Sequence, residues 1–321
     1  MKKITILLLI MCICLSFGLL MSCGGGGGSS SDDPAEDDVN NYLCFTSTGK
    51  STIWMTVFGT VNSLPALEYS KDKTTWEDFV IEDTTVYLEN GEKVYFRGNN
   101  TSFSKDDVDY LNFGMTGSIA ASGNIMSLLD ESCKSVTLPG DYCFYCLFSN
   151  CDVLTAAPEL PATNLTEGCY NSMFYGCTNL TTAPKLPATT LTPYCYDGMF
   201  ANCTALTAAP ELPATTLTPY CYDFMFSNCE NLTAAPELPA ETLVEYCYFG
   251  MFLNCINLNS ITVYFTDWNT SDNSTGMWVY SVADSGTFRC PSALVPSPLT
   301  DTDFSEDKFP KETSHWNVET F

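Results

Sequence analysis

The chain has 321 residues, 45% of them hydrophobic, and a formal net charge of −25. Its apolar content is high enough to build a buried core, which excludes a chain that is disordered throughout. Its acidity excludes nucleic acid as a partner, because phosphates repel it and few Lys or Arg residues are present to release counterions.

The N-terminus predicts an exported protein with a lipid anchor. Two lysines precede an uncharged apolar run over 4–21, which Ser22 and Cys23 follow. A small residue directly before a cysteine, after an apolar segment, resembles the bacterial lipoprotein signal. The resemblance implies a signal peptide at 1–22, a lipid on Cys23 and attachment to the outer membrane by that lipid alone. The alternative is a plain transmembrane anchor, since the run is just long enough to span a bilayer.

Residues 23–41 predict a flexible tether. After Cys23 the sequence GGGGGSSSDDPAEDDVNN combines Gly and Ser, which keep a chain flexible, with carboxylates that keep it solvated. An acidic cluster shortly after the lipidated cysteine resembles the surface-export signal of some Gram-negative lipoproteins, which implies a protein that faces the exterior. A Ca²⁺ site in this cluster is the alternative, but the fixed turn of an EF-hand loop is missing.

Residues 42–122 predict an all-β, sandwich-like domain, because no 12-residue stretch has helical periodicity. The strongest local signal is Asn90-Gly91, which stands between β-branched runs at 85–89 and 93–97. Asn-Gly supplies the two positive φ angles of a type I′ turn, so this segment predicts a hairpin.

A 26-residue unit repeats four times without gaps over 157–260, and a degenerate copy begins before it at Asp141. Similarity at a fixed period is the signature of stacked repeats, in which each unit packs against its neighbours. We predict an α/β solenoid over 123–290, worn caps included, followed by a C-terminal capping segment at 291–321.

Each unit predicts one short helix and one short strand. Thr192 followed by proline is a helix start, the helix runs over 194–201, and Asn202 takes the left-handed position that ends it. A short apolar stretch at 206–209 predicts a strand that ends before Pro210. Stacked strands then form a parallel sheet on one face, with helices on the other.

The apolar positions of one unit should face a core shared with its neighbours, because one unit cannot bury them alone. These inward positions are Leu191, Cys195, Met199, Phe200, Cys203, Leu206 and Leu212.

The spacing Met-Phe-x-x-Cys-x-x-Leu-x-x-x-Pro recurs in every full copy and resembles the BspA-like branch of leucine-rich repeats. The resemblance implies an α/β leucine-rich-repeat solenoid on a bacterial surface. It also implies adhesion to protein or glycan ligands of a host or of other microbes. No motif of that family marks contact residues.

Two cysteines recur in each unit, eight residues apart, as in Cys195 and Cys203. They are either buried thiols that act as small apolar residues, or one disulfide in each repeat, which an oxidising compartment permits. A zinc site is not predicted, because His315 is the only histidine and the chain has no two CxxC motifs that could pair.

The sequence nominates no catalytic residue and no cofactor, so we expect a protein that binds rather than an enzyme. An adhesin-type scaffold is the first hypothesis, a glycan-binding accessory protein for nutrient capture is the second, and a structural coat is the third. Glu159, Glu211 and Glu237 form an exposed column that Lys185 interrupts, with no role assigned.

Aromatic residues are the candidate ligand contacts. Trp54 and Trp76 are either core residues or glycan contacts, and two tyrosine columns are either packing between repeats or stacking surfaces for sugar rings. The tyrosines are Tyr170, Tyr196, Tyr222 and Tyr248 in one column, and Tyr194, Tyr220 and Tyr246 in the other.

Overall fold

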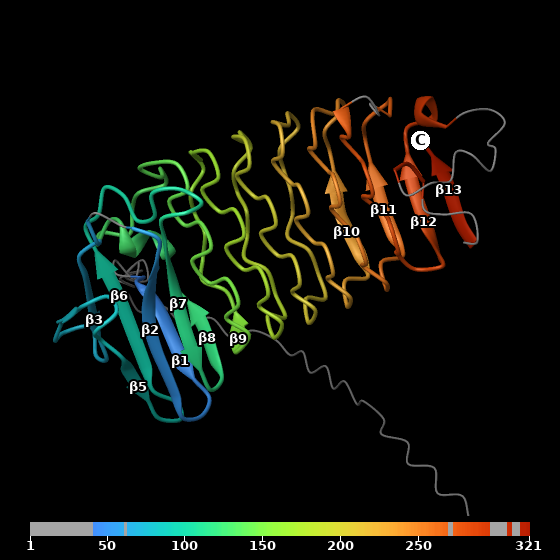
Figure 1. Cartoon of the computed structure of the whole chain (residues 1–321). Coiled ribbons are helices and arrows are strands. Elements are labelled where there is room, and N and C mark those ends of the chain that lie inside the picture. Colours follow the sequence, from blue (N-terminus) through green and yellow to red (C-terminus); the bar gives the residue numbers. More distant parts are fainter. Residues whose placement is uncertain (1–40, 61–62, 269–271, 296–306, 310–314) are drawn as a thin grey trace, which may run out of the picture. The chain divides into compact units, whose positions relative to one another are not determined.

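The computed structural model describes residues 41–60, 63–268, 272–295, 307–309 and 315–321 (Figure 1). The predicted signal peptide, the lipidated Cys23 and nearly all of the tether lie outside the described residues. No helix among the described residues is long and apolar enough to span a membrane.

The N-terminal part is built from two sheets whose strands are almost all antiparallel. The three-stranded sheet has the order β5 (Val86–Leu88), β2 (Ser51–Phe58) and β7 (Tyr110–Thr116). The six-stranded sheet has the order β4 (Glu77–Phe79), β3 (Leu67–Ser70), β6 (Lys93–Gly98), β1 (Leu43–Ser47), β8 (Ile119–Ser122) and β9 (Leu154–Ala156).

Aromatic side chains fill the space between these two sheets. Phe113 of β7 packs edge-on against Phe45 of β1 and Phe96 of β6, with ring centroids 5.3 and 5.5 Å apart. All three rings are fully buried. The predicted antiparallel β domain is therefore confirmed, and its core lies between the sheets.

The two predicted tryptophan positions are not in this core. Trp54 is half-buried and lies across Gly114 of the neighbouring strand, where an added Cβ would meet the indole ring. Trp76 is also half-buried; its ring is 5.0 Å from that of Tyr42 and lies under the Arg97 guanidinium at 4.1 Å. Both rings are packed against partners, so neither presents a fully open face.

The predicted hairpin at Asn90-Gly91 is wrong. β5 pairs with β2 and β6 pairs with β1 and β3, so the turn connects two sheets rather than two paired strands. Gly91 has a φ of 80°, whereas Asn90 stays outside the left-handed region. The Gly91 N–H donates to the Ser47 carbonyl at 2.8 Å, and this bond docks the turn onto the end of β1.

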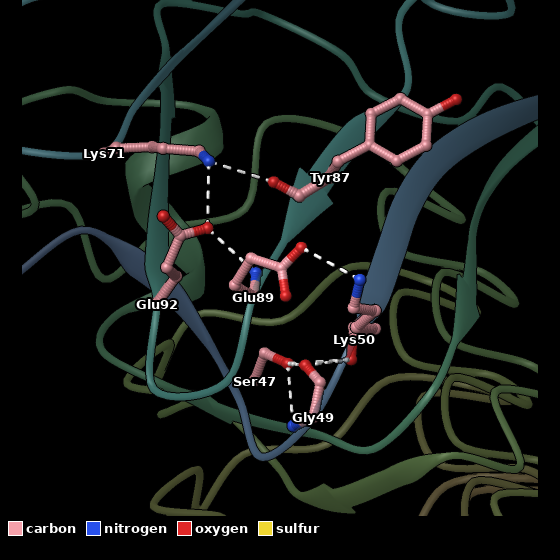
Figure 2. Close-up of polar contacts among 8 residues, drawn as sticks. Ser47, Gly49, Lys50, Lys71, Tyr87, Glu89 and Glu92 are labelled. Atoms are coloured by element: carbon pink, nitrogen blue, oxygen red, sulfur yellow. Dashed lines mark hydrogen bonds and ion pairs between the residues drawn. The ribbon is translucent and has the colours of Figure 1, made fainter.

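Ion pairs at the same turn are drawn in Figure 2. Lys71 Nζ donates to the Tyr87 carbonyl at 2.9 Å and pairs with Glu92 at 3.1 Å, while Lys50 pairs with Glu89 at 3.5 Å. Exposed pairs of this kind contribute little to stability, about 0–1 kcal/mol each. The turn is therefore fixed mainly by its backbone bonds to β1.

The segments predicted as helices are not α-helices. Tyr194, Gly198 and Asn202 have φ angles of 57°, 58° and 63°, so every fourth residue is left-handed. An α-helix of L-residues does not tolerate that pattern. The left-handed stop predicted at Asn202 is confirmed, and the same residue type takes it in the next two copies. We call these segments turn ribbons: 166–177, 192–203, 218–229 and 244–255.

Backbone N–H groups of a turn ribbon alternate between two kinds of partner. The Asp197 N–H donates within the copy to the Tyr194 carbonyl at 3.2 Å. The Gly198 N–H donates to the backbone carbonyl of Asp223, in the next copy, at 2.7 Å. An α-helix would use its N–H groups internally, and two turns of helix are barely stable alone. The ribbon instead bonds each copy to the next, which explains why the helix does not form.

The inward positions predicted for each unit are confirmed. Met199, Phe200 and Leu206 are completely buried, and the cysteines and remaining leucines of the unit are at most 5% exposed. One column of rings stacks with centroids 5.4–5.9 Å apart from β7 through every copy. Its members are Phe113, Phe148, Phe174, Phe200, Phe226 and Phe252.

The C-terminal part contains a parallel sheet of four strands. In order these are β10 (Ala234–Leu238), β11 (Ser260–Val263), β12 (Ser285–Cys290) and β13 (His315–Thr320). The described part of the chain also contains the short 3₁₀ helices η1 (Ile125–Leu128) and η3 (Ser292–Leu294).

The prediction of one short strand in every unit is wrong, because the described residues between β9 and β10 contain no strand and the parallel sheet begins only at β10. The prediction ended the strand before Pro210, yet β10 contains the equivalent Pro236, and 206–209 is not a strand. The register of β10 against β11 is irregular between Ala234 and Glu237. Proline has no N–H for the ladder, so the irregularity lies where a hydrogen bond is unavailable.

Candidate binding surfaces

The first predicted tyrosine column is buried. Tyr170, Tyr196, Tyr222 and Tyr248 are each 1% exposed, and their rings stack with centroids 5.9–6.0 Å apart. No ring face or edge is left for a ligand. The prediction that these four residues contact a ligand is therefore corrected, and they act as packing between copies.

The second tyrosine column is half-buried. Tyr194, Tyr220 and Tyr246 stack with centroids 4.6 and 4.7 Å apart, so their inner ring faces are covered by one another. The preceding copy has Gly168 at this position, and the ring of Tyr142 lies over it. A sugar ring therefore has access only to the part of each tyrosine ring that remains exposed.

Two carboxylates lie beside this column in neighbouring copies. Asp197 accepts a hydrogen bond from Asn171 Nδ2 at 3.0 Å, and burial raises its pKa to about 7. Burial, and then the charge of Asp197, raise the pKa of Asp223 to about 8. Oδ1 of Asp223 is buried without a hydrogen-bond partner. The pair therefore retains a proton near neutral pH.

Our sequence reasoning missed this pair. The signal available was the position that follows Cys-Tyr in each copy, which holds Asn171, Asp197, Asp223 and Phe249 in turn. Acidic residues at a regular core-flanking position are partly buried, which raises the pKa of both, and the charge of Asp197 raises the pKa of Asp223 further.

A groove runs across the copies where their Ala-Pro-x-Leu-Pro segments lie side by side, and we call it the proline groove. It consists of three hollows of about 440, 400 and 370 Å³, each lined by two neighbouring copies. Successive hollows share lining residues, so they form one continuous surface. Two rows of prolines line the groove: Pro158, Pro184, Pro210 and Pro236 form the first row, and Pro161, Pro187, Pro213 and Pro239 form the second. The residue that follows each proline of the first row is charged, and these residues are Glu159, Lys185, Glu211 and Glu237.

The charged side chains of the proline groove are exposed. At one end Glu159 accepts a hydrogen bond from Asn41 at 2.9 Å, and at the other Glu237 accepts one from Tyr264 Oη at 3.5 Å. The exposed column seen in the sequence is confirmed. Its role as the lining of a groove was not predicted, because the prolines suggested only the ends of strands.

The described cysteines are all free thiols, and most are buried. In five consecutive copies the second cysteine donates its S–H to a phenylalanine carbonyl of the preceding layer; Cys203 donates to Phe174 at 3.1 Å. Burial raises the pKa of Cys203 to about 12, so the thiolate is scarce at neutral pH. Of the two alternatives for the cysteines, this favours buried thiols. Within the described ranges no group of three or more metal-ligating side chains gathers.

Comparisons of the chain with protein-family models, curated proteins and solved structures found no match. The surfaces that remain as candidates for binding are the proline groove and the exposed part of the second tyrosine column.

Proposed function

We propose that this protein is a lipid-anchored binding scaffold on the cell surface. Its repeat array would be a solenoid of the leucine-rich-repeat type, built with turn ribbons in place of helices. The in-register stacking of rings and the hydrogen bonds between copies support the solenoid. The proposal assigns the protein no enzymatic activity and no cofactor.

The observation that carries the binding proposal is the proline groove. Most regular positions of a copy have a packing role, yet the groove leaves charged side chains and the rings of Pro187 and Pro213 exposed over three successive junctions. A repeated, exposed and concave surface is what extended repeat proteins use to bind ligands. We therefore expect the groove to contact protein ligands on host or microbial surfaces.

Anchoring and display are tested in cells that express the full chain. Protease added to intact cells should digest the protein, and Cys23→Ala should release it from the membrane fraction, because the lipid is attached there. Protection of the protein until the cells are lysed would overturn surface display. Retention of the Cys23→Ala variant in the membrane would favour the transmembrane alternative.

Glycan capture for nutrient uptake is a second candidate, and Tyr194 is the residue that favours it. It is the end ring of the stacked column, because the preceding copy has Gly168 at this position, and its half-buried ring keeps an exposed part that could contact a sugar. A glycan array probed with the wild type and Tyr194→Ala tests this candidate. Glycan binding that Tyr194→Ala abolishes supports it, and an array without any signal rejects it.

A further inference from the structure

We propose that the proline groove binds an extended polypeptide segment rich in Lys and Arg. This inference rests on the proposed function and names the chemical class of its ligand. The inference depends on two properties of the groove. Its apolar proline walls stand beside carboxylates, and the central carboxylate, that of Glu211, has no hydrogen-bond or ion-pair partner among the described residues.

The groove matches the two parts of a long basic side chain. Lys and Arg carry an aliphatic stem that packs on apolar surface and a cationic head that seeks a charged or wet environment. Around the central hollow, Pro210 and Pro213 supply apolar ring surface, and Glu211 stands between them along the chain. An amino sugar has its cation directly on the ring, without a stem, and so matches only the carboxylate.

Glu211 is available for such a partner. Its side chain is exposed, and it makes no hydrogen bond or ion pair with the described residues. The two copies next to that of Glu211 place Lys185 on one side and Glu237 on the other, and Glu159 lies one copy beyond Lys185. The groove therefore has three carboxylates and one cation in a row, a balance that favours a basic ligand.

The charge of the rest of the chain excludes two other occupants. The formal net charge is −25, so a second copy of the chain would be repelled. The tether next to Asn41 contains seven residues over 32–38 with five carboxylates and no cation. Folding back of that segment onto the groove would bring like charges together, so the ligand must come from a partner.

The experiment measures binding of a labelled peptide of alternating Lys and Ser by fluorescence anisotropy. The full chain is held in neutral detergent at about 0.15 M salt, where charges more than about 8 Å apart are largely screened. A Glu-Ser peptide is the matched probe. Glu211→Lys should weaken binding about tenfold, and Lys185→Glu should tighten it about tenfold, because each reverses one groove charge. The Glu-Ser peptide should not bind.

The matched control is Glu230→Lys, which makes the same charge change at an exposed residue that does not line the groove. It should alter the affinity less than twofold. Equal weakening by Glu230→Lys and Glu211→Lys would overturn the proposal, since the attraction would then be non-specific. A failure of Lys185→Glu to tighten binding would also overturn it, and so would equal binding of a glucosamine oligomer with the same dependence on the groove charges.

These outcomes separate the inference from the function on which it rests. If the peptide does not bind, while the protein is digested on intact cells and retains another surface ligand, the inference fails and the proposed function stands. If the protein is protected in intact cells, display at the surface fails whatever the peptide result.

Discussion

The two sides of one repeat contact the next repeat in different ways. In the turn ribbon, alternate backbone N–H groups bond to the neighbouring copy, and the phenylalanine rings beneath stack in a fully buried column. In the proline groove, Pro184 and Pro187 have no N–H to offer, and hollows remain between copies. The comparison suggests that the ribbon side stabilises the array and that the groove side is available for binding.

Truncation of the phenylalanine column should have the largest effect. Phe200 is fully buried and stacks on rings 5.6 and 5.7 Å away in the two flanking copies. Phe200→Ala should lower the free energy of unfolding by about 3–5 kcal/mol, through lost burial and the cavity left behind. Denaturant unfolding followed by circular dichroism measures this.

The matched change on the groove side is Pro210→Ala, which should cost less than about 1 kcal/mol because its ring is only partly buried. If both variants lost the same stability, the distinction between the two sides would be lost.

A change at the buried carboxylate pair should have the next largest effect, and it depends on pH. The pKa of Asp223 is about 8 in the folded protein, against 3.8 as its ordinary value. The folded state therefore holds more protons between these values, so stability falls as pH rises from about 4 to about 8. Asp223→Asn removes this loss and should stabilise the protein by about 2 kcal/mol at pH 8.

The measurement is denaturant unfolding of the wild type and of Asp223→Asn at pH 5 and pH 8. The gain from the substitution should be larger at pH 8, where the wild-type carboxyl would otherwise be forced to ionise beside Asp197. A gain that is the same at both pH values would show that the substitution acts through packing alone.

The recurring thiols predict a smaller effect. Cys203→Ala removes a buried S–H donor and leaves the Phe174 carbonyl without that bond, so it should cost about 1–2 kcal/mol. Thiol titration of the denatured, unreduced protein should find all 14 of the described cysteines free. A titration of about four would instead support one disulfide in each repeat.

Part of this fold was predictable from sequence because repetition fixes what packs on what. The inward positions of the unit, including Met199 and Phe200, follow from the alignment alone and are confirmed. The turn ribbon was not predictable, since a left-handed residue at every fourth position repeats at nearly the period of a helix. Tyr194 and Tyr220 adopt that conformation although most non-glycine residues avoid it.

The candidate site was less predictable than the fold, because the same residue types serve packing and contact. Tyr196 and Tyr194 stand two positions apart, yet one is buried and the other is half-buried. The two tyrosines differ in burial because the backbone points one side chain into the core and the other toward the surface. The prolines of the groove were interpreted as strand ends, and their alignment into a wall depends on how the copies stack.

The smallest expected effect is at the centre of the groove. Glu211→Gln keeps the size of an exposed side chain that has no partner among the described residues, so it should change the free energy of unfolding by less than about 0.5 kcal/mol. The same denaturant series measures it beside Phe200→Ala. A loss of more than 1 kcal/mol would mean that the groove carboxylates help to hold neighbouring copies together. The adjacent copies carry Lys185 on one side and Glu237 on the other, so attraction and repulsion offset each other and removal of the Glu211 charge should be close to neutral.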